Sequence, residues 1–86
     1  MQADLDILRE RVLDAARKSA VATKVEDVAL EPDRDEEGTD FLRVIVQVKD
    51  IDHTGDADFE ALLEAIETTV GAIDERYPSV RFLDAA

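Results

Sequence analysis

The fold class follows first from nine residues in the middle of the chain, Phe41-Leu42-Arg43-Val44-Ile45-Val46-Gln47-Val48-Lys49. Successive side chains of a β-strand point to opposite faces, so every second residue here shares a face. One face is entirely aliphatic and comprises Leu42, Val44, Val46 and Val48. The other face mixes polar and apolar groups. This alternation predicts a strand over 41–49 with one face in a core.

The strongest helical periodicity comes after this strand. Apolar residues recur at i, i+3, i+4 and i+7 from Phe59 to Tyr77, namely Phe59, Leu62, Leu63, Ile66, Val70, Ile73 and Tyr77. This spacing places them on one side of a helix. The pattern predicts an amphipathic helix over 59–77, with Glu60, Glu64, Glu67 and Asp74 on its outer side. Pro78 is expected to end it.

Three further elements are predicted from weaker patterns. Apolar residues at helical spacing predict a helix over 4–20. A β-branched run predicts a strand over 24–31 that ends at Pro32, and 79–83 is expected to form a short last strand. The stretch Asp33 to Asp40 is acidic, contains Gly38 and is longer than a tight hairpin needs, so we expect a mobile turn region.

The predicted order is helix, strand, strand, helix, strand, which defines an α+β fold in a single domain spanning residues 1–86. The crossover through the second helix predicts that the second and third strands are parallel, either adjacent or separated by the first strand. Three strands cannot wrap around a core. We therefore expect both helices on one face of a mixed sheet, with the other face open.

The open face is expected to carry apolar side chains from two strands: Phe41, Ile45, Val25 and Ala29. Apolar groups on a sheet face that no helix covers are typical of an interface. The sequence therefore predicts a homodimer, or a different partner, on this face. The alternative is that a loop or the C-terminal tail of the same chain covers it.

Size and charge restrict the partners. Eighty-six residues bury a modest core, so dimerisation would add stability. The formal net charge of −12 repels phosphate backbones and anionic lipids, which argues against nucleic acid and membrane as partners. A basic protein or a cation fits better. Alternatively, the charge only maintains solubility or adapts the chain to a salty cytoplasm.

Cysteine usage and the N-terminus bear on location. The chain contains no cysteine, which excludes disulfides and thiolate metal sites. The N-terminal residues include acids where a signal peptide has lysines, and no apolar run approaches the roughly 18 residues of a spanning helix. A cytoplasmic protein is expected.

The connection between the second strand and the second helix holds candidate metal ligands. These are Asp50, Asp52, His53, Asp56 and Asp58. Their spacing partly matches the calcium loop D-x-[DN]-x-[DN]-G-x5-E, with Thr54 at position five and Gly55 at position six. Position twelve is Ala61, so the bidentate glutamate of that loop is missing. The sequence predicts at most a weak site for calcium or another divalent cation.

A structural role for the same acids is the alternative. Thr54, Asp56 or Asp58 can cap the second helix, and the acids favour its positive N-terminal end. His53 is the only histidine, and one imidazole needs carboxylate help to hold a transition metal.

Catalysis has little support in the sequence. No serine or threonine has a nearby histidine to activate it, so we expect a protein that is not an enzyme. The side chains expected to contact a basic partner are Glu60, Glu64 and Glu67, together with the stretch Asp33 to Asp40. Arg81, opposite Val80 and Phe82 in the last strand, is a further candidate for partner binding.

Two family resemblances add expectations. The element order and the phrases Ile66-Glu-Thr-Thr-Val70 and Tyr77-Pro-Ser-Val-Arg-Phe82 resemble the soluble domain that ends cation diffusion facilitator transporters. That resemblance implies a dimeric cytoplasmic module that binds divalent metal between subunits. Where that family often has a histidine in the last strand, this chain has Phe82 and Leu83.

The C-terminal phrase Asp74-Glu-Arg-Tyr-Pro-Ser-Val-Arg-Phe82 resembles the endings of small acidic proteins from bacterial toxin or defence operons. This second likeness implies an antitoxin-like role. Two functional hypotheses follow. The first is an acidic protein-binding module that dimerises and binds a basic partner, for example as an inhibitor. The alternative is a divalent-cation-responsive regulatory domain that uses Asp50 to Asp58.

Overall fold

The computed structural model describes residues 3–19 and 21–85 of the chain. Its main elements are helix α1 (Leu5–Arg17), strands β1 (Val25–Arg34) and β2 (Asp40–Val48), helix α2 (Asp56–Ile73) and strand β3 (Tyr77–Asp84). Two 3₁₀ turns, η1 (Ala22–Lys24) and η2 (Ile51–His53), precede β1 and α2. The α-β-β-α-β order and the α+β class predicted from the sequence are confirmed.

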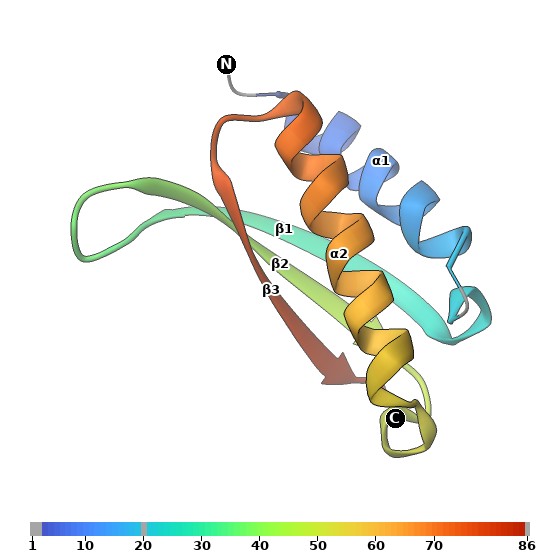
Figure 1. Ribbon diagram of the computed structural model, residues 1–86. Coiled ribbons are helices and arrows are strands. Elements are labelled where there is room, and N and C mark those ends of the chain that lie inside the picture. The colour runs from blue at the N-terminus through green and yellow to red at the C-terminus, as the bar shows by residue number, and fades with distance from the viewer. Residues whose placement is uncertain (1–2, 20, 86) are drawn as a thin grey trace.

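The sheet has the order β1-β2-β3, with β1 antiparallel and β3 parallel to β2. Both helices lie on the same face of the sheet (Figure 1). The mixed sheet with one helical layer is therefore as predicted. The strand order, which the sequence left open, places the most aliphatic strand in the centre, where both of its neighbours and both helices shield it.

The core lies between the sheet and the two helices. The four aliphatic residues of β2 are completely buried there, as their alternation predicts. Helices α1 and α2 and strand β1 supply the other large buried side chains: Leu8, Val12, Leu62, Ile66, Val70 and Val28. Phe59 and Phe82 pack at the edge of this core with ring centroids 5.0 Å apart.

Strand β1 is longer than predicted. It continues through Pro32, which is opposite Leu42, and ends at Arg34. Proline is tolerated because β1 is an edge strand, whose outward N–H groups have no ladder partner. The turn is therefore only residues 35–39, and the Asp35 carboxylate orders it by accepting hydrogen bonds from the backbone N–H groups of Glu37 and Thr39. The hairpin projects well beyond the helices (Figure 1).

Helix α2 occupies Asp56–Ile73 and not the predicted 59–77. Its C-terminal end is at Ile73 because Asp74 adopts an extended conformation (φ −139°, ψ 146°). Tyr77 consequently belongs to β3. Helix α1 begins after Asp4, whose side chain accepts a hydrogen bond from the Asp6 N–H, and it ends at Arg17. Residue 20, the predicted end of that helix, lies outside the described residues.

Candidate functional site

The acidic connection between β2 and α2 is a compact turn. Asp50 has a left-handed backbone conformation (φ 51°, ψ 45°), which aspartate tolerates better than most residues. The Thr54 hydroxyl donates to the Asp50 carbonyl oxygen over 3.2 Å. The Lys24 ammonium lies 3.3 Å from both the His53 carbonyl oxygen and Thr54 Oγ1. These contacts fix the turn against the start of β1.

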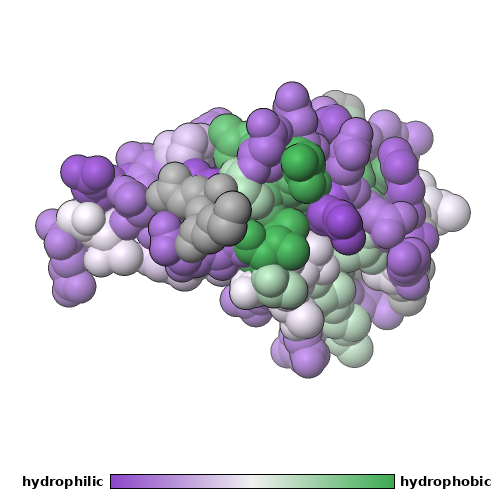
Figure 2. All heavy atoms as spheres, turned by 90° about the horizontal axis from the view of Figure 1, so that it is seen from above, coloured by the Kyte–Doolittle hydropathy of each residue, from purple (hydrophilic) through white to green (hydrophobic). Residues whose placement is uncertain are grey.

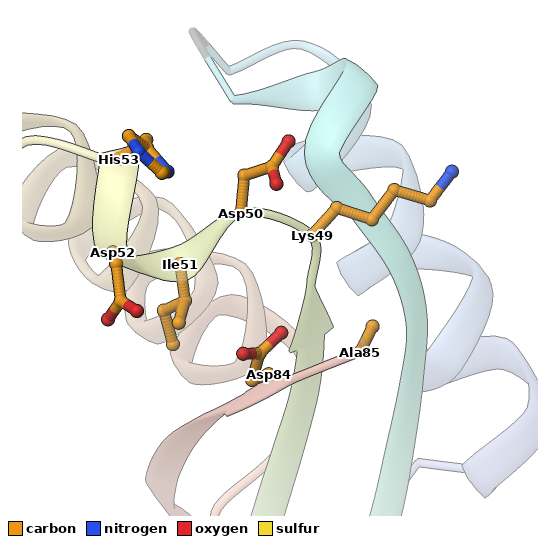
Figure 3. Close-up of a pocket in the computed structure, with 7 residues that line it drawn as sticks. All are labelled: Lys49, Asp50, Ile51, Asp52, His53, Asp84 and Ala85. Atoms are coloured by element: carbon orange, nitrogen blue, oxygen red, sulfur yellow. The ribbon is translucent and has the colours of Figure 1, made fainter.

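A shallow depression of about 330 Å³ lies beside this turn. It is lined by Lys49, Asp50, Ile51, Asp52, His53, Asp84 and Ala85. Figure 3 shows the Asp52 side chain on the opposite side of the turn from those of Asp50 and His53. The depression therefore brings together three of the five predicted metal ligands without making them converge on one point.

The other two predicted ligands, Asp56 and Asp58, lie in the first turn of α2 and are exposed. Among residues 3–19 and 21–85, no three histidine, aspartate or glutamate side chains are grouped so that they could hold a metal ion. One described subunit thus does not supply the ligand set that calcium or zinc needs.

The predicted side-chain cap of α2 is wrong. Gly55 is the N-cap residue, and no side-chain hydrogen bond caps this end of the helix. Thr54 is unavailable because its hydroxyl bonds to Asp50. Asp56 and Asp58 instead place two carboxylates next to the positive end of the helix, which is the favourable electrostatic position.

The second candidate site is the sheet face that carries no helix, here called the open face. Strand pairing defines its residues row by row, since residues directly opposite each other share a face. The rows are Asp33/Phe41/Tyr77, Glu31/Arg43/Ser79, Ala29/Ile45/Arg81 and Asp27/Gln47/Leu83. Tyr77 and Leu83 are 44% and 48% exposed, so two large apolar groups meet solvent here.

Phe41, Ile45 and Ala29 lie on the open face, as predicted. Val25 does not. An irregularity in the pairing between Val25 and Asp27 shifts the register, so that Val25 is opposite Val48 and packs against the core on the helix side. A bulge adds one residue to a strand, so the side chains that precede it point to the opposite face of the sheet from the one that simple alternation predicts.

Aromatic and charged groups are interlocked at one end of the open face. The rings of Phe41 and Tyr77 stack with centroids 5.3 Å apart, and the Arg43 guanidinium lies 5.5 Å from the Phe41 centroid. Arg43 also pairs with Asp33 at 2.9 Å and with Glu31 at 3.5 Å. The Tyr77 hydroxyl donates to Asp35 Oδ2 over 2.8 Å. The hairpin is thus joined to β3 through side chains.

These contacts shift the pKa values of Asp33, Asp35 and Tyr77 at this end of the sheet. The Arg34 N–H and the Arg43 guanidinium hold the pKa of Asp33 below its ordinary value. The Thr39 N–H and the Tyr77 hydroxyl do the same for the pKa of Asp35. The Asp35 carboxylate in turn raises the pKa of Tyr77. Both acids are therefore charged at neutral pH, and Tyr77 is neutral.

The residues predicted to bind a basic partner are dispersed. Glu60, Glu64 and Glu67 are exposed along α2, on the helical side of the molecule. Arg81 is exposed on the open face, where it makes no ion pair or hydrogen bond with any residue the structure describes. Seen from above, the projecting hairpin is mostly hydrophilic, and hydrophobic residues gather over the middle of the molecule among hydrophilic ones (Figure 2).

Sequence reasoning missed Tyr77 and Leu83 as open-face residues. Tyr77 was assigned to the helix, although it precedes Pro78, and a residue before proline is disfavoured in helical conformation. That signal alone could have moved Tyr77 into the strand. Parallel pairing of β3 with β2 then places Tyr77 beside Phe41 and Leu83 beside Gln47.

Comparison with solved structures places this fold among known ones. The chain superposes on a double variant of the MamM C-terminal domain with a TM-score of 0.57, at 15% identity and 94% coverage of both chains. A second MamM C-terminal domain variant gives a TM-score of 0.56 at 18% identity, with 94% and 93% coverage. The copper form of the same domain gives 0.50 at 15% identity.

MamM is a cation diffusion facilitator, so the predicted resemblance to the soluble domain of that class is confirmed at the level of the fold. No protein-family model matches this sequence, and no curated protein is significantly similar to it. The likeness to antitoxin-like proteins gains no support and stays a prediction. Within residues 3–19 and 21–85, no helix is both long and apolar enough to cross a bilayer.

Proposed function

We propose that this chain is a regulatory domain that is not an enzyme, forms a homodimer through its open face and responds to divalent cations in the cytoplasm. The observation that supports this most strongly is the agreement of fold with MamM C-terminal domains over 94% of both chains. One of those solved structures is a copper form.

The donors assigned to the cation are Asp50, Asp52 and His53, which line the depression, together with Asp56 and Asp58 in the first turn of α2. Within the described residues of one subunit they form no complete ligand set. The proposal therefore requires water molecules or a second subunit to complete coordination. Carboxylates favour calcium or magnesium, whereas the imidazole of His53 favours copper or zinc.

Thermal unfolding in the presence of metal tests this proposal. A ligand that binds only the folded state stabilises it by RT ln(1 + [L]/Kd) and thereby raises the melting temperature. We expect copper, zinc, calcium or magnesium at millimolar concentration to raise the melting temperature of the wild-type chain, and Asp50→Asn with His53→Gln to abolish the rise. Asparagine suits position 50 because it tolerates the left-handed conformation.

The matched control is Glu64→Gln with Glu67→Gln, which removes acid from the far side of α2 and should leave the metal response intact. No shift for any of the four metals would remove the cation response. An equal loss of response in both double variants would show that the metal acts through general charge.

The acidic protein-binding module is the second candidate. It is favoured by the net charge of −12 and by the row of exposed glutamates on α2, Glu60, Glu64 and Glu67. A basic partner held by such contacts would co-purify at low salt and dissociate at about 1 M salt, where the Debye length falls to about 3 Å. Glu60, Glu64 and Glu67 changed together to glutamine should abolish that co-purification.

A further inference from the structure

The charges on the open face are distributed unevenly between its two edges. Along β1 the side chains are Asp27, Ala29, Glu31 and Asp33, which include three carboxylates. Along β3 they are Tyr77, Ser79, Arg81 and Leu83, which include no carboxylate and one guanidinium. The two edge strands lie about 10 Å apart, one on each side of β2.

Cations of the same subunit compensate part of the β1 charge. The Arg9 guanidinium, which reaches from α1, pairs with Asp27 and donates from Nε to the Val28 carbonyl oxygen over 2.9 Å. Arg43 pairs with Glu31 and Asp33. Three carboxylates against two guanidiniums leave one excess negative charge on the β1 edge. Arg81 on the opposite edge has no partner among the described residues, so the two edges are complementary.

The direction of the two-fold axis decides whether a second copy of the chain can use this complementarity, and two limiting directions can be compared. When two identical sheet faces pack together, the two-fold axis lies in the plane between them. An axis across the strands places β1 against β1, and therefore carboxylates against carboxylates. An axis along β2 places β1 of each subunit against β3 of the other. The first arrangement is repulsive and the second attractive.

We infer that the open face binds a second copy of this chain about a two-fold axis along β2, with Arg81 of each subunit against the acidic β1 edge of the other. This rests on the proposed homodimer and adds its geometry. In the strand-pairing rows, Arg81 lies level with Ala29, so Asp27 and Glu31 of the other subunit flank it. Ile45, in the same row, meets its own copy and supplies the apolar centre.

Arg43 also approaches its own copy near the axis. Its charge is already matched within its subunit by Asp33 and Glu31, so this approach brings together two compensated groups. Phe41, which stacks on Tyr77, faces its own copy further along β2 and extends the apolar centre.

Charge reversal with complementation tests the arrangement. In a homodimer of either Arg81→Glu or Glu31→Lys, like charges meet at both symmetry-related contacts. Sedimentation equilibrium should therefore show a dimer dissociation constant at least about tenfold above that of the wild type. Both side chains are exposed, and circular dichroism should confirm that both variants fold. Glu31→Lys leaves Arg43 its closer partner, Asp33.

The mixture of the two variants gives the decisive result. A heterodimer of Arg81→Glu with Glu31→Lys pairs opposite charges at both contacts, so mixing should restore association to near the wild-type level. Arg81→Glu mixed with Glu64→Lys, which reverses a charge on α2 away from the open face, should not.

A wild-type chain that stays monomeric would overturn the proposed homodimer and this inference with it. A wild-type dimer that Arg81→Glu leaves unchanged would overturn only the inference, as would two weakened variants that fail to associate when mixed. In those cases the dimer uses another axis or another face.

Discussion

Arg76 and Asp74 form a buried ion pair in which Arg76 Nη2 lies 2.8 Å from Asp74 Oδ2 and Arg76 Nε lies 3.0 Å from Asp74 Oδ1. Asp74 Oδ2 also accepts the Ala3 N–H over 2.9 Å, and Arg76 Nη2 donates to the Ala3 carbonyl oxygen over 3.3 Å. The pair therefore ties the segment before α1 to the connection between α2 and β3, two regions at opposite ends of the sequence.

Replacing Asp74 with asparagine should destabilise the chain by about 3 kcal/mol, because the buried Arg76 guanidinium loses its counter-ion. Urea unfolding at pH 7 measures the change. Glu67→Gln, an exposed acid-to-amide change on α2, is the control and should alter the free energy of unfolding by less than about 0.5 kcal/mol. Equal effects in the two variants would show that the ion pair adds nothing to the free energy of unfolding.

The same pair predicts a pH dependence. Hydrogen bonds from the Arg76 guanidinium, and then from the Arg76 and Ala3 N–H groups, hold the pKa of Asp74 well below its ordinary value of 3.8. A carboxyl whose pKa is lower in the folded state stabilises that state above its unfolded pKa, and this stability is lost as the pH falls towards the folded pKa. The difference in unfolding free energy between wild type and Asp74→Asn should therefore be constant above about pH 5 and shrink below about pH 4. A difference that stays constant down to pH 3 would contradict this cause.

Two glycine-to-alanine changes should shift the free energy of unfolding in opposite directions. Gly38 in the hairpin turn has φ +82°, where an alanine is strained, so Gly38→Ala should cost about 1 kcal/mol. Gly71 lies within α2, and a methyl group there meets no atom within 4 Å, so Gly71→Ala should stabilise by up to about 1 kcal/mol. Melting temperatures of the two variants check this. Shifts of the same sign would contradict the assigned backbone conformations.

Truncation in the core should be severe in a chain of this size. Leu62 is completely buried between α2 and the sheet, and Leu62→Ala should cost roughly 2–5 kcal/mol. Stabilities of small domains lie near the lower end of about 5–15 kcal/mol, so partial unfolding at 37 °C is expected. Circular dichroism against urea, with Glu60→Ala as the exposed control on the same helix, measures the loss.

The sequence was sufficient for much of this fold because the main elements bury one face each. The alternation in β2 and the periodicity in α2 correctly predicted Leu42, Val44, Val46 and Val48 in the core opposite Leu62, Ile66 and Val70. Both patterns arise from burial, and burial is what the hydrophobic effect selects.

The remaining features depend on contacts that no local pattern contains. The end of α2 is set by Asp74, which bonds to Ala3 at the far end of the chain. The position of Val25 is set by an irregularity in strand pairing. The continuation of β1 through Pro32 is possible only because β1 became an edge strand. The candidate metal residues were identified by spacing alone, and the compact turn at Asp50 directs Asp52 away from Asp50 and His53 (Figure 3).

Cysteine cross-linking shows whether a second copy of the chain covers the open face. The chain has no cysteine, so Ile45→Cys introduces a single thiol at the centre of the proposed interface. A short bismaleimide spans the roughly 10 Å between packed sheets. We predict rapid cross-linking of Ile45→Cys to a covalent dimer and none of Glu67→Cys on the outer side of α2. Equally slow cross-linking of both variants, at concentrations where the wild type is tested for association, would show that Ile45 does not lie at an interface between two copies.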